Sequence, residues 1–428
     1  MYITINGTDY GCIKALSFAP EVDPAGMTLP INGFEADIFT SDVAKVGHYA
    51  QLRDDLGRLW ADYYITWAVR VDADILRIRA ESPLTLIARD VLPATYYNAA
   101  PIADVLVDVF RNTGSGLGAY IYELDQAFSG AIITGYAPKQ SARERLLWAC
   151  FAIGAQVTSS FSDRIWIVPA DAGNTLIPMR DTFWRPAASE GECVTAIRAN
   201  AYSYVPGTPA PTDEWVQDSF GATYIVTARA FELLNPNAPS DAPENVISLE
   251  GLYFLNENNV TAVMARLADW RFNPRELTLE CIDNADYRPG MRVTAFDGED
   301  GMMSGVIRRV AFRFGVQARA RLSLAGALAV ASAVLVVRCL FEGIQVGRSE
   351  FRFPVGYDYA VTNPYIDTEM NGHRYILRPL EAACTGRMPQ EGVTVDVSCA
   401  AALDLCGGVL HVISVDGAEE SNNTGVIA

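Results

Sequence analysis

Residues 286–324, DYRPGMRVTAFDGEDGMMSGVIRRVAFRFGVQARARLSL, carry the pattern on which the fold depends. Within them, segments 291–296, 304–314 and 317–324 alternate apolar and polar side chains over much of their length. A period of two is typical of antiparallel strands with one buried face. The glycines and acids of residues 297–301 suit a hairpin turn. The stretch therefore predicts three strands joined by tight turns.

The two faces of this predicted sheet differ in character. One face is apolar, although Arg308 interrupts it, and its members are Val306, Val310, Phe312, Phe314, Ala318, Ala320, Leu322 and Leu324. The opposite face carries four arginines, Arg309, Arg313, Arg319 and Arg321. We expect the first face to be buried and the second to be exposed.

The composition of the chain limits its class. The 428 residues are too many for one ordinary core, so we expect two to four domains. Half of the residues are apolar, which predicts a folded chain. The net charge of −18, with no basic run, argues against specific nucleic-acid binding, because phosphate contacts dominate that affinity.

Cysteines and apolar runs indicate a chain made in a reducing cytoplasm, without a membrane span. The eight cysteines form no CxxC pair, and only Cys406 with His411 approaches a zinc-ligand spacing. We interpret them as free structural thiols. The first twelve residues lack the layout of a signal peptide. The apolar run 322–337 is shorter than the roughly twenty residues of a spanning helix, so a soluble linker is favoured over a membrane span.

The predicted class is α+β, in several domains. Residues 1–90 are expected to supply the strands of a first barrel; the triplet 40–42 closes a strand or caps a short helix at 43–52. Residues 91–175 are an α+β module, with a helix after Pro101 and a second helix that a Ser141–Glu144 capping box opens and Gly154 ends. Residues 176–330 are a second barrel with inserted loops. Residues 331–416 are a C-terminal β-grasp or immunoglobulin-like domain, and 417–428 a mobile tail.

The search for chemistry finds no catalytic, cofactor-binding or metal-binding residue. The three histidines, His48, His373 and His411, have no complete set of triad or ligand partners. The glycine-rich segment 114–118 follows a helix, so it is a connector and not a phosphate loop. Exposed aromatics such as Trp215 and Trp270 would suit sugar stacking, but core packing explains them more simply. We predict that the protein is not an enzyme; a glycosidase is the enzymatic alternative.

Two stretches resemble the hub proteins of phage tail baseplates and tail tips over roughly residues 1–325. The first is residues 130–147, GAIITGYAPKQSARERLL, followed by DRIWIVP at 163–169, which is similar to that family's α+β module. The second runs from RPGMRV at 288–293 to GVIRRVAFRFG at 305–315, and looks like its returning barrel strands. In residues 334–397, LVVRC, GYDYAV, TGRMP and VTVDV resemble the mucin-binding-type β-grasp repeats of bacterial surface proteins.

The hub resemblance implies a homotrimeric ring in which two barrels per chain match a hexameric tail tube and adapt it to a threefold tip. It implies as partners other copies of the chain, the tail tube protein, distal baseplate, spike or fibre proteins and the tape-measure protein, with no cofactor. It places the protein in the virion tail tip or baseplate, after assembly in the bacterial cytoplasm. If the chain forms such a ring, the interface candidates, which face a neighbour or the lumen, are Arg309, Arg313, Arg319 and Arg321. The alternative is a tail-tip adhesin whose C-terminal domain contacts host surface glycans.

Overall fold

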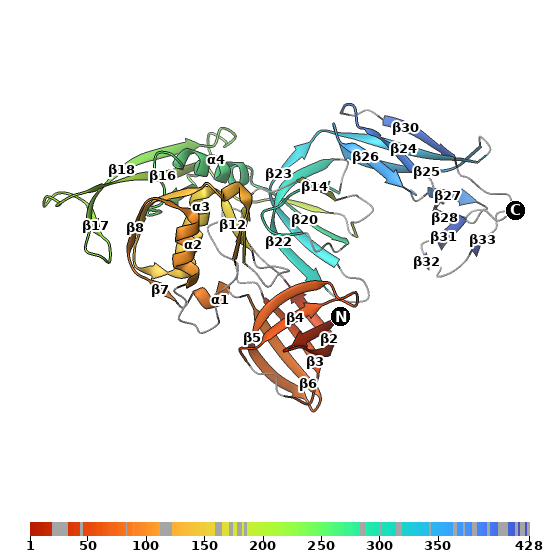
Figure 1. Ribbon diagram of the computed structural model, residues 1–428. Helices are drawn as coiled ribbons and strands as arrows, with labels where there is room; N and C mark the ends of the chain where they lie inside the picture. Colours follow the sequence, from red (N-terminus) through yellow and green to blue (C-terminus); the bar gives the residue numbers. More distant parts are fainter. Residues whose placement is uncertain are drawn as a thin grey trace. The chain divides into compact units, whose positions relative to one another are not determined.

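The computed structural model divides into two compact units (Figure 1). Unit 1 is Met1–Thr175, Thr182–Val293 and Gly305–Leu328, and unit 2 is Leu176–Asp181, Thr294–Ser304 and Ala329–Ala428. The residues that the structure describes are 1–18, 33–42, 46–82, 84–88, 90–111, 122–158, 165–170, 174–177, 182–183, 186–282, 284, 287–298, 301–313, 319–341, 344–362, 366–370, 373–378, 383–391, 394–400, 410–415, 418–419 and 424–425.

The predicted α+β class is wrong, because the fold is mostly β. The described helices are α1 (Leu84–Ile87), α2 (Ile102–Arg111), the 3₁₀ helix η1 (Gln126–Phe128), α3 (Ala142–Ile153) and α4 (Val260–Arg271). Short segments without clear alternation also became strands, because each adds its backbone hydrogen bonds to a sheet that already exists. Examples are β14 (Asn174–Ile177), β15 (Ala187–Glu190) and β17 (Trp215–Gln217).

The first six strands form a closed barrel. They are β1 (Tyr2–Ile5), β2 (Thr8–Phe18), β3 (Gly33–Phe39), β4 (Tyr49–Arg53), β5 (Leu59–Asp72) and β6 (Ile75–Glu81). Their order is β1-β4-β5-β6-β3-β2, and a further pairing of β1 with β2 closes the circle. Alternate residues of β3, Phe34, Ala36 and Ile38, are buried, as the period of two requires. The alternative of a helix at 43–52 is wrong where the structure describes it, since β4 occupies its end; residues 43–45 lie outside the described part.

The three strands predicted in residues 286–324 are confirmed as β21 (Arg292–Phe296), β22 (Met302–Arg313) and β23 (Arg319–Val330). The sheet of the first barrel continues through β2-β22-β23 to β20 (Arg275–Ile282) and β15, and β14 pairs with β21, which pairs with β22. The predicted apolar face is buried at every described position, with Phe312 fully enclosed. Phe314 and Ala318 lie outside the described residues. Phe312 packs edge-on against Trp60, with ring centroids 5.0 Å apart, so β22 joins the core of the first barrel.

A helical module lies between the strands of unit 1. Its strands are β7 (Val91–Leu92), β8 (Thr95–Pro101), β9 (Tyr122–Leu124), β10 (Ile132–Ala137), β11 (Gln140–Ser141), β12 (Ala155–Thr158) and β13 (Ile165–Pro169). Figure 1 shows α2 and α3 side by side, and both contribute to one core. The predicted capping box is confirmed: Ser141 Oγ accepts from the Glu144 N–H, and the Glu144 carboxylate accepts from the Ser141 N–H. Gly154 ends α3 in the left-handed conformation, also as predicted.

A four-stranded sheet completes unit 1. Its order is β17-β18-β16-β19, with β16 (Ala196–Pro206), β18 (Thr223–Leu234) and β19 (Val246–Leu249). Val260, Val263, Met264 and Leu267 form an apolar stripe on α4 that is buried against β16.

Unit 2 is built from strands. They are β24 (Ser332–Phe341), β25 (Ile344–Pro354), β26 (Asp358–Thr362), β27 (Ile366–Met370), β28 (His373–Arg378), β29 (Ala383–Arg387), β30 (Thr394–Ala400), β31 (Leu410–Val415), β32 (Ala418–Glu419) and β33 (Thr424–Gly425). The main sheet runs β30-β24-β25-β27-β28-β31-β32, with β33 also on β31, and β26 pairs with β29. Ala333, Leu335, Phe353 and Met388 form a small buried core.

The described residues test several other predictions only in part. The apolar run 322–337 is divided between β23 and β24. None of the described helices has the length and apolarity that a membrane crossing needs. The glycine-rich segment 114–118 and most of the tail 417–428 lie outside the described residues. The five-segment division, the mobility of the tail and the β-grasp or immunoglobulin-like assignment stay predictions.

Candidate assembly site

The four arginines predicted as interface candidates occupy one face of neighbouring strands. Arg309 and Arg313 are exposed on β22, Arg321 is exposed on β23, and Arg319 is half-buried there. β22 and β23 are adjacent in the sheet, so the structure brings the four side chains to the same surface. Their role in an interface stays a prediction.

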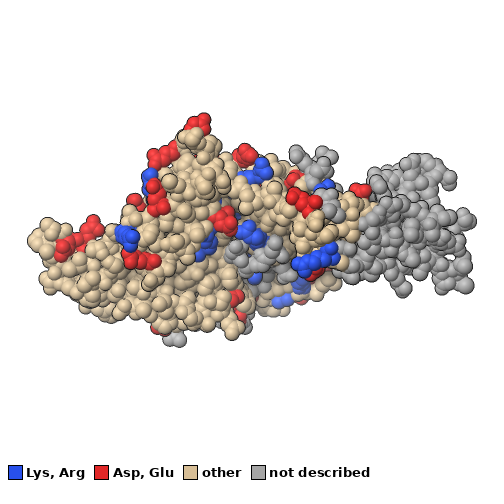
Figure 2. Space-filling model, turned by 90° about the horizontal axis from the view of Figure 1, so that it is seen from above, with Lys and Arg blue, Asp and Glu red and all other residues tan. Residues whose placement is uncertain are grey.

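Acidic residues of β20 lie among these arginines. Glu280 faces Arg321 in the β20–β23 register, and its Oε1 is 3.9 Å from Nη1 of Arg313. Glu276 Oε1 lies 3.0 Å from Nη1 of Arg308. On the face that Figure 2 draws, acidic and basic side chains are also interspersed. Ion pairs near the surface typically add only about 0–1 kcal/mol to stability, so these pairs contribute little to holding the fold.

Arg319 has an additional contact that fixes its direction. Its guanidinium carbon lies 4.3 Å from the ring centroid of Phe183, a cation–π distance. The Phe183 N–H also donates to the Glu280 carbonyl at 2.8 Å. A side chain held in this way needs less ordering when a partner binds.

Histidine and cysteine side chains, which can bind metals or carry catalysis, occur in the described part of the chain. Among the described residues, no group of three or more His, Cys, Asp or Glu side chains is placed to hold a metal ion. His48 contacts the amide of Asn6 in the first barrel. The side chains of His373 and His411 lie outside the described part. Burial raises the pKa of the Cys150 thiol, which favours its neutral form.

A buried glutamine attaches the helical module to the strands that follow it. Gln156 of β12 donates from Nε2 to the Pro289 carbonyl at 2.7 Å, across 133 residues of sequence. Gly290 follows with a φ of +84°, and a Cβ atom there would lie 2.0 Å from Gln156 Oε1. Position 290 therefore needs glycine for the close approach of Gln156 as well as for its backbone conformation.

Tyrosines join the module to the four-stranded sheet. Tyr96 lies 4.2 Å from Tyr224 and 5.3 Å from Tyr204, measured between ring centroids. Tyr136 Oη donates to the Gln217 carbonyl at 3.1 Å. Burial raises the pKa of Tyr96, Tyr136 and Tyr204, so these phenols are neutral at physiological pH. The contacts hold β17 and β18 against the module.

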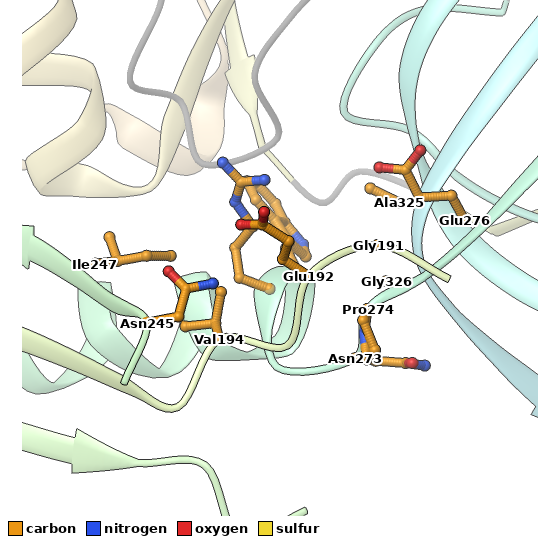
Figure 3. Close-up of a pocket in the computed structure, with 12 residues that line it drawn as sticks. Gly191, Glu192, Val194, Asn245, Ile247, Asn273, Pro274, Glu276, Ala325 and Gly326 are labelled. Carbon is orange, nitrogen blue, oxygen red and sulfur yellow. The ribbon is translucent and has the colours of Figure 1, made fainter. Parts of the chain in front are cut away.

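A pocket of about 340 Å³ opens where α4 ends (Figure 3). The residues that line it are Gly191, Glu192, Val194, Asn245, Ile247, Trp270, Arg271, Asn273, Pro274, Glu276, Ala325 and Gly326. In Figure 3, Asn245 and Ile247 lie on one side, Glu276 and Ala325 on the other, and Glu192 between them. The pocket is thus bounded by the start of β19, the end of α4 and the strands β20 and β23.

Close backbone packing shapes this pocket. Gly326, with a φ of +62°, brings β23 so near to the last turn of α4 that a Cβ atom would lie 3.0 Å from the Trp270 carbonyl oxygen. Asn273 Nδ2 donates to the Ala327 carbonyl at 2.6 Å, and Asn245 Nδ2 donates to the Cys193 carbonyl at 3.1 Å. These hydrogen bonds hold the side-chain amides of Asn273 and Asn245 in place.

Neither the pocket nor the Gln156 contact is predictable from the amino-acid sequence. The prediction of core packing is confirmed for Trp270, whose side chain is 2% exposed, and is wrong for Trp215, which is 51% exposed. The indole Nε1 of Trp270 is itself buried and has no hydrogen-bond partner among the residues that the structure describes. Both features depend on residues that are far apart in sequence, which alternation and turn chemistry do not reveal.

Comparison with known proteins gives similarity of structure without similarity of sequence. No family model and no curated protein matches the chain. The chain is similar to the tail protein from Neisseria meningitidis MC58, with 12% identity and a TM-score of 0.52, over 76% of this chain and 95% of that one. It is also similar to the 43 kDa tail protein of prophage MuSo2 from Shewanella oneidensis (11% identity, TM-score 0.48, 76% and 97% covered). Prophage tail protein gp18 from Listeria monocytogenes EGD-e gives 10% identity and a TM-score of 0.48, over 76% and 93%. The likeness to the Neisseria protein shows a shared fold.

Proposed function

We propose that this chain is a non-enzymatic structural protein of a phage tail or a related injection machine. The observation that carries the proposal is the fold shared with the Neisseria tail protein, which extends over nearly all of that protein. The closed barrel, the helical module and the returning strands follow in the order that the resemblance to hub proteins implies. That resemblance places the protein at the distal end of the tail, as a ring that adapts the hexameric tube to a threefold tip.

Association between copies is the mechanism that this role requires. Among the strands that the structure describes, β15 is the last in the order of the large sheet, with all four residues exposed, so one of its sides can accept another strand. The mixed charges around Arg313 and Glu280 supply a pattern that a neighbour can match. A homotrimer with the tube protein on one side and spike, fibre or tape-measure proteins on the other would use both features.

Light scattering of the purified chain, alone and mixed with tail tube protein, tests the proposal. We expect a defined oligomer, either of the chain alone or once tube protein is added. The second case arises because a ring that closes only on the tube leaves the chain monomeric when it is alone. A chain that remains monomeric and never associates with tube protein contradicts the hub role.

A tail-tip adhesin is the second candidate, and the separate core of unit 2 favours it. A domain with its own core is suited to carry a receptor contact that the ring does not need. Binding of the full chain to an array of host surface glycans tests this role. Binding to a defined glycan supports it, while absence of binding contradicts it and leaves the hub role unaffected.

A further inference from the structure

Two cysteines occupy opposite positions on neighbouring strands of unit 2. In the parallel pairing of β24 with β30, Cys339 is the register partner of Cys399. The register continues without a shift from Val334 to Leu340 of β24, so the two cysteines lie inside an unbroken ladder. Their juxtaposition is therefore set by the sheet and not by a loop.

The other cysteines that the structure describes have no cysteine opposite them. Those that lie in strands have as register partners Ile38 for Cys12, Ala320 for Cys281 and Val361 for Cys384. Cys150 is in α3, and Cys193 lies outside the strands. No disulfide joins Cys12, Cys150, Cys193 or Cys281. In the described part of the chain, the opposition of two cysteines is thus particular to β24 and β30.

The backbone spacing of this pair suits a disulfide. Neighbouring strands of a sheet lie about 4.7–4.9 Å apart, and residues joined by a disulfide have Cα atoms about 4.4–6.8 Å apart. Register partners on neighbouring strands belong to the same face of the sheet. The ladder therefore places Cys339 and Cys399 at a separation that a disulfide spans without any movement of the two strands.

A bond at this position would hold the far end of β30. In the described part of the chain, β30 is the first strand in the order of its sheet and pairs with β24. Val395, near the start of β30, packs against the small core that contains Ala333 and Leu335. Cys399 lies four residues further along the strand, about 13 Å away at the usual rise of a parallel strand. A disulfide would add a second attachment at the end opposite to the core.

We propose that Cys339 and Cys399 form a disulfide that joins β30 to β24 when the protein leaves a reducing compartment. The step is a thiol–disulfide exchange with a low-molecular-weight disulfide such as oxidised glutathione. One cysteine attacks the small disulfide, and the other then displaces the small thiol that remains attached. One S–S bond breaks and one forms, and the two protons of the protein thiols end on the two small thiols that are released.

The timing of this oxidation rests on the proposed function. A tail protein is assembled in the bacterial cytoplasm, where thiols are kept reduced, and acts outside the cell, where disulfides persist. The bond would therefore form after assembly and stabilise unit 2 in the released particle. The choice of the two cysteines rests on the register of β24 and β30 alone.

Mapping of disulfides in the full chain tests the proposal. The purified chain is equilibrated with a series of ratios of oxidised to reduced glutathione, quenched with N-ethylmaleimide and digested for mass spectrometry. We expect a pair of peptides joined through Cys339 and Cys399, with the loss of two of the eight thiols that can be alkylated. The proposal is overturned if a folded chain keeps both cysteines alkylated or bound to glutathione at every ratio. It is also overturned if either cysteine joins a different one.

Thermal unfolding measures what the bond does. We expect oxidation to raise the unfolding temperature of unit 2 by about 10 °C, because the bond restricts the unfolded chain. Cys339→Ser and Cys399→Ser should each abolish the difference between oxidised and reduced protein. Cys384→Ser, a matched control on β29, should retain it. The comparison of the oxidised with the reduced parent chain needs no substitution, and an equal unfolding temperature in both would overturn the stabilising role.

Light scattering of the same oxidised samples with tube protein separates this inference from the proposed function. A chain that forms the bond but never associates with tube protein contradicts the tail role alone. A chain that associates while both cysteines stay reduced under oxidising conditions overturns the disulfide alone.

Discussion

Gly290 is required both for its backbone conformation and for the close approach of a neighbouring side chain. The backbone has a φ of +84°, and a Cβ atom would meet the side chain of Gln156 at 2.0 Å. We expect Gly290→Ala to lower the free energy of unfolding by about 3 kcal/mol, from backbone strain and overpacking together. Urea denaturation measures the loss.

Gly7 provides the matched control for this substitution. Its φ is +79°, but no atom lies within 4 Å of the position its Cβ would take. Gly7→Ala should therefore cost only about 1 kcal/mol, from the backbone alone. Equal losses at the two glycines would show that the Gln156 contact does not restrict position 290.

Because of Tyr97, part of the stability of the helical module is lost at alkaline pH. Burial is the main cause that raises the pKa of its phenol, whose Oη donates to Asp108 at 2.9 Å. A group whose folded pKa is raised contributes stability that is complete below its unfolded pKa of about 10 and lost as pH rises beyond it. We expect Tyr97→Phe to flatten the fall in stability above pH 10, measured by urea denaturation between pH 8 and 11. If the free energy of unfolding fell equally steeply with pH in Tyr97→Phe and in the parent chain, this prediction would be contradicted.

Phe312 and Arg309 test the two faces of β22. Phe312 is fully buried against Trp60, so Phe312→Asp should cost at least about 4 kcal/mol and unfold the domain. Arg309 is exposed, so Arg309→Glu should change stability by less than about 1 kcal/mol and impair association. Circular dichroism and light scattering separate the two effects. If both variants behave alike, the assignment of the faces is wrong.

Among the elements, α3 has the most clearly defined beginning. Its capping box satisfies the N–H groups of Ser141 and Glu144 at the first turn. Ser141→Ala should cost about 1 kcal/mol and increase hydrogen exchange in the first turn of α3, whereas Ser141→Asp retains an acceptor and should preserve most of the protection. Faster exchange spread uniformly over the module would contradict a local capping role.

Elements defined by nearby residues were predicted well from sequence. The capping box spans three residues, and the strands around Val310 and Leu322 alternate over a few residues each, so both patterns are visible in the chain itself. β15 and β17 were missed because an edge strand gains its hydrogen bonds from a neighbour, whatever its own pattern. The expected α+β class is wrong for a different reason: strands make up most of the described elements along the whole chain, and helices are few.

At the scale of the whole molecule, the pairing of strands that are far apart in sequence determines which residues become neighbours. The strands between Tyr2 and Glu81 close the first barrel, and in the described part of the chain β22 joins it through the pairing of Phe18 with Phe312. The arginine surface was predictable because Arg309 and Arg321 follow local alternation. The pocket was not, because Val194, Trp270 and Gly326 meet only after two sheets and α4 have packed.

Native mass spectrometry of the chain assembled with tail tube protein tests the central claim most directly. A trimeric ring predicts a subcomplex with three times the 46.6 kDa mass of one chain, released as a unit when the tube protein is removed. Single chains bound independently to the tube, with no subcomplex of this chain alone, would contradict the account.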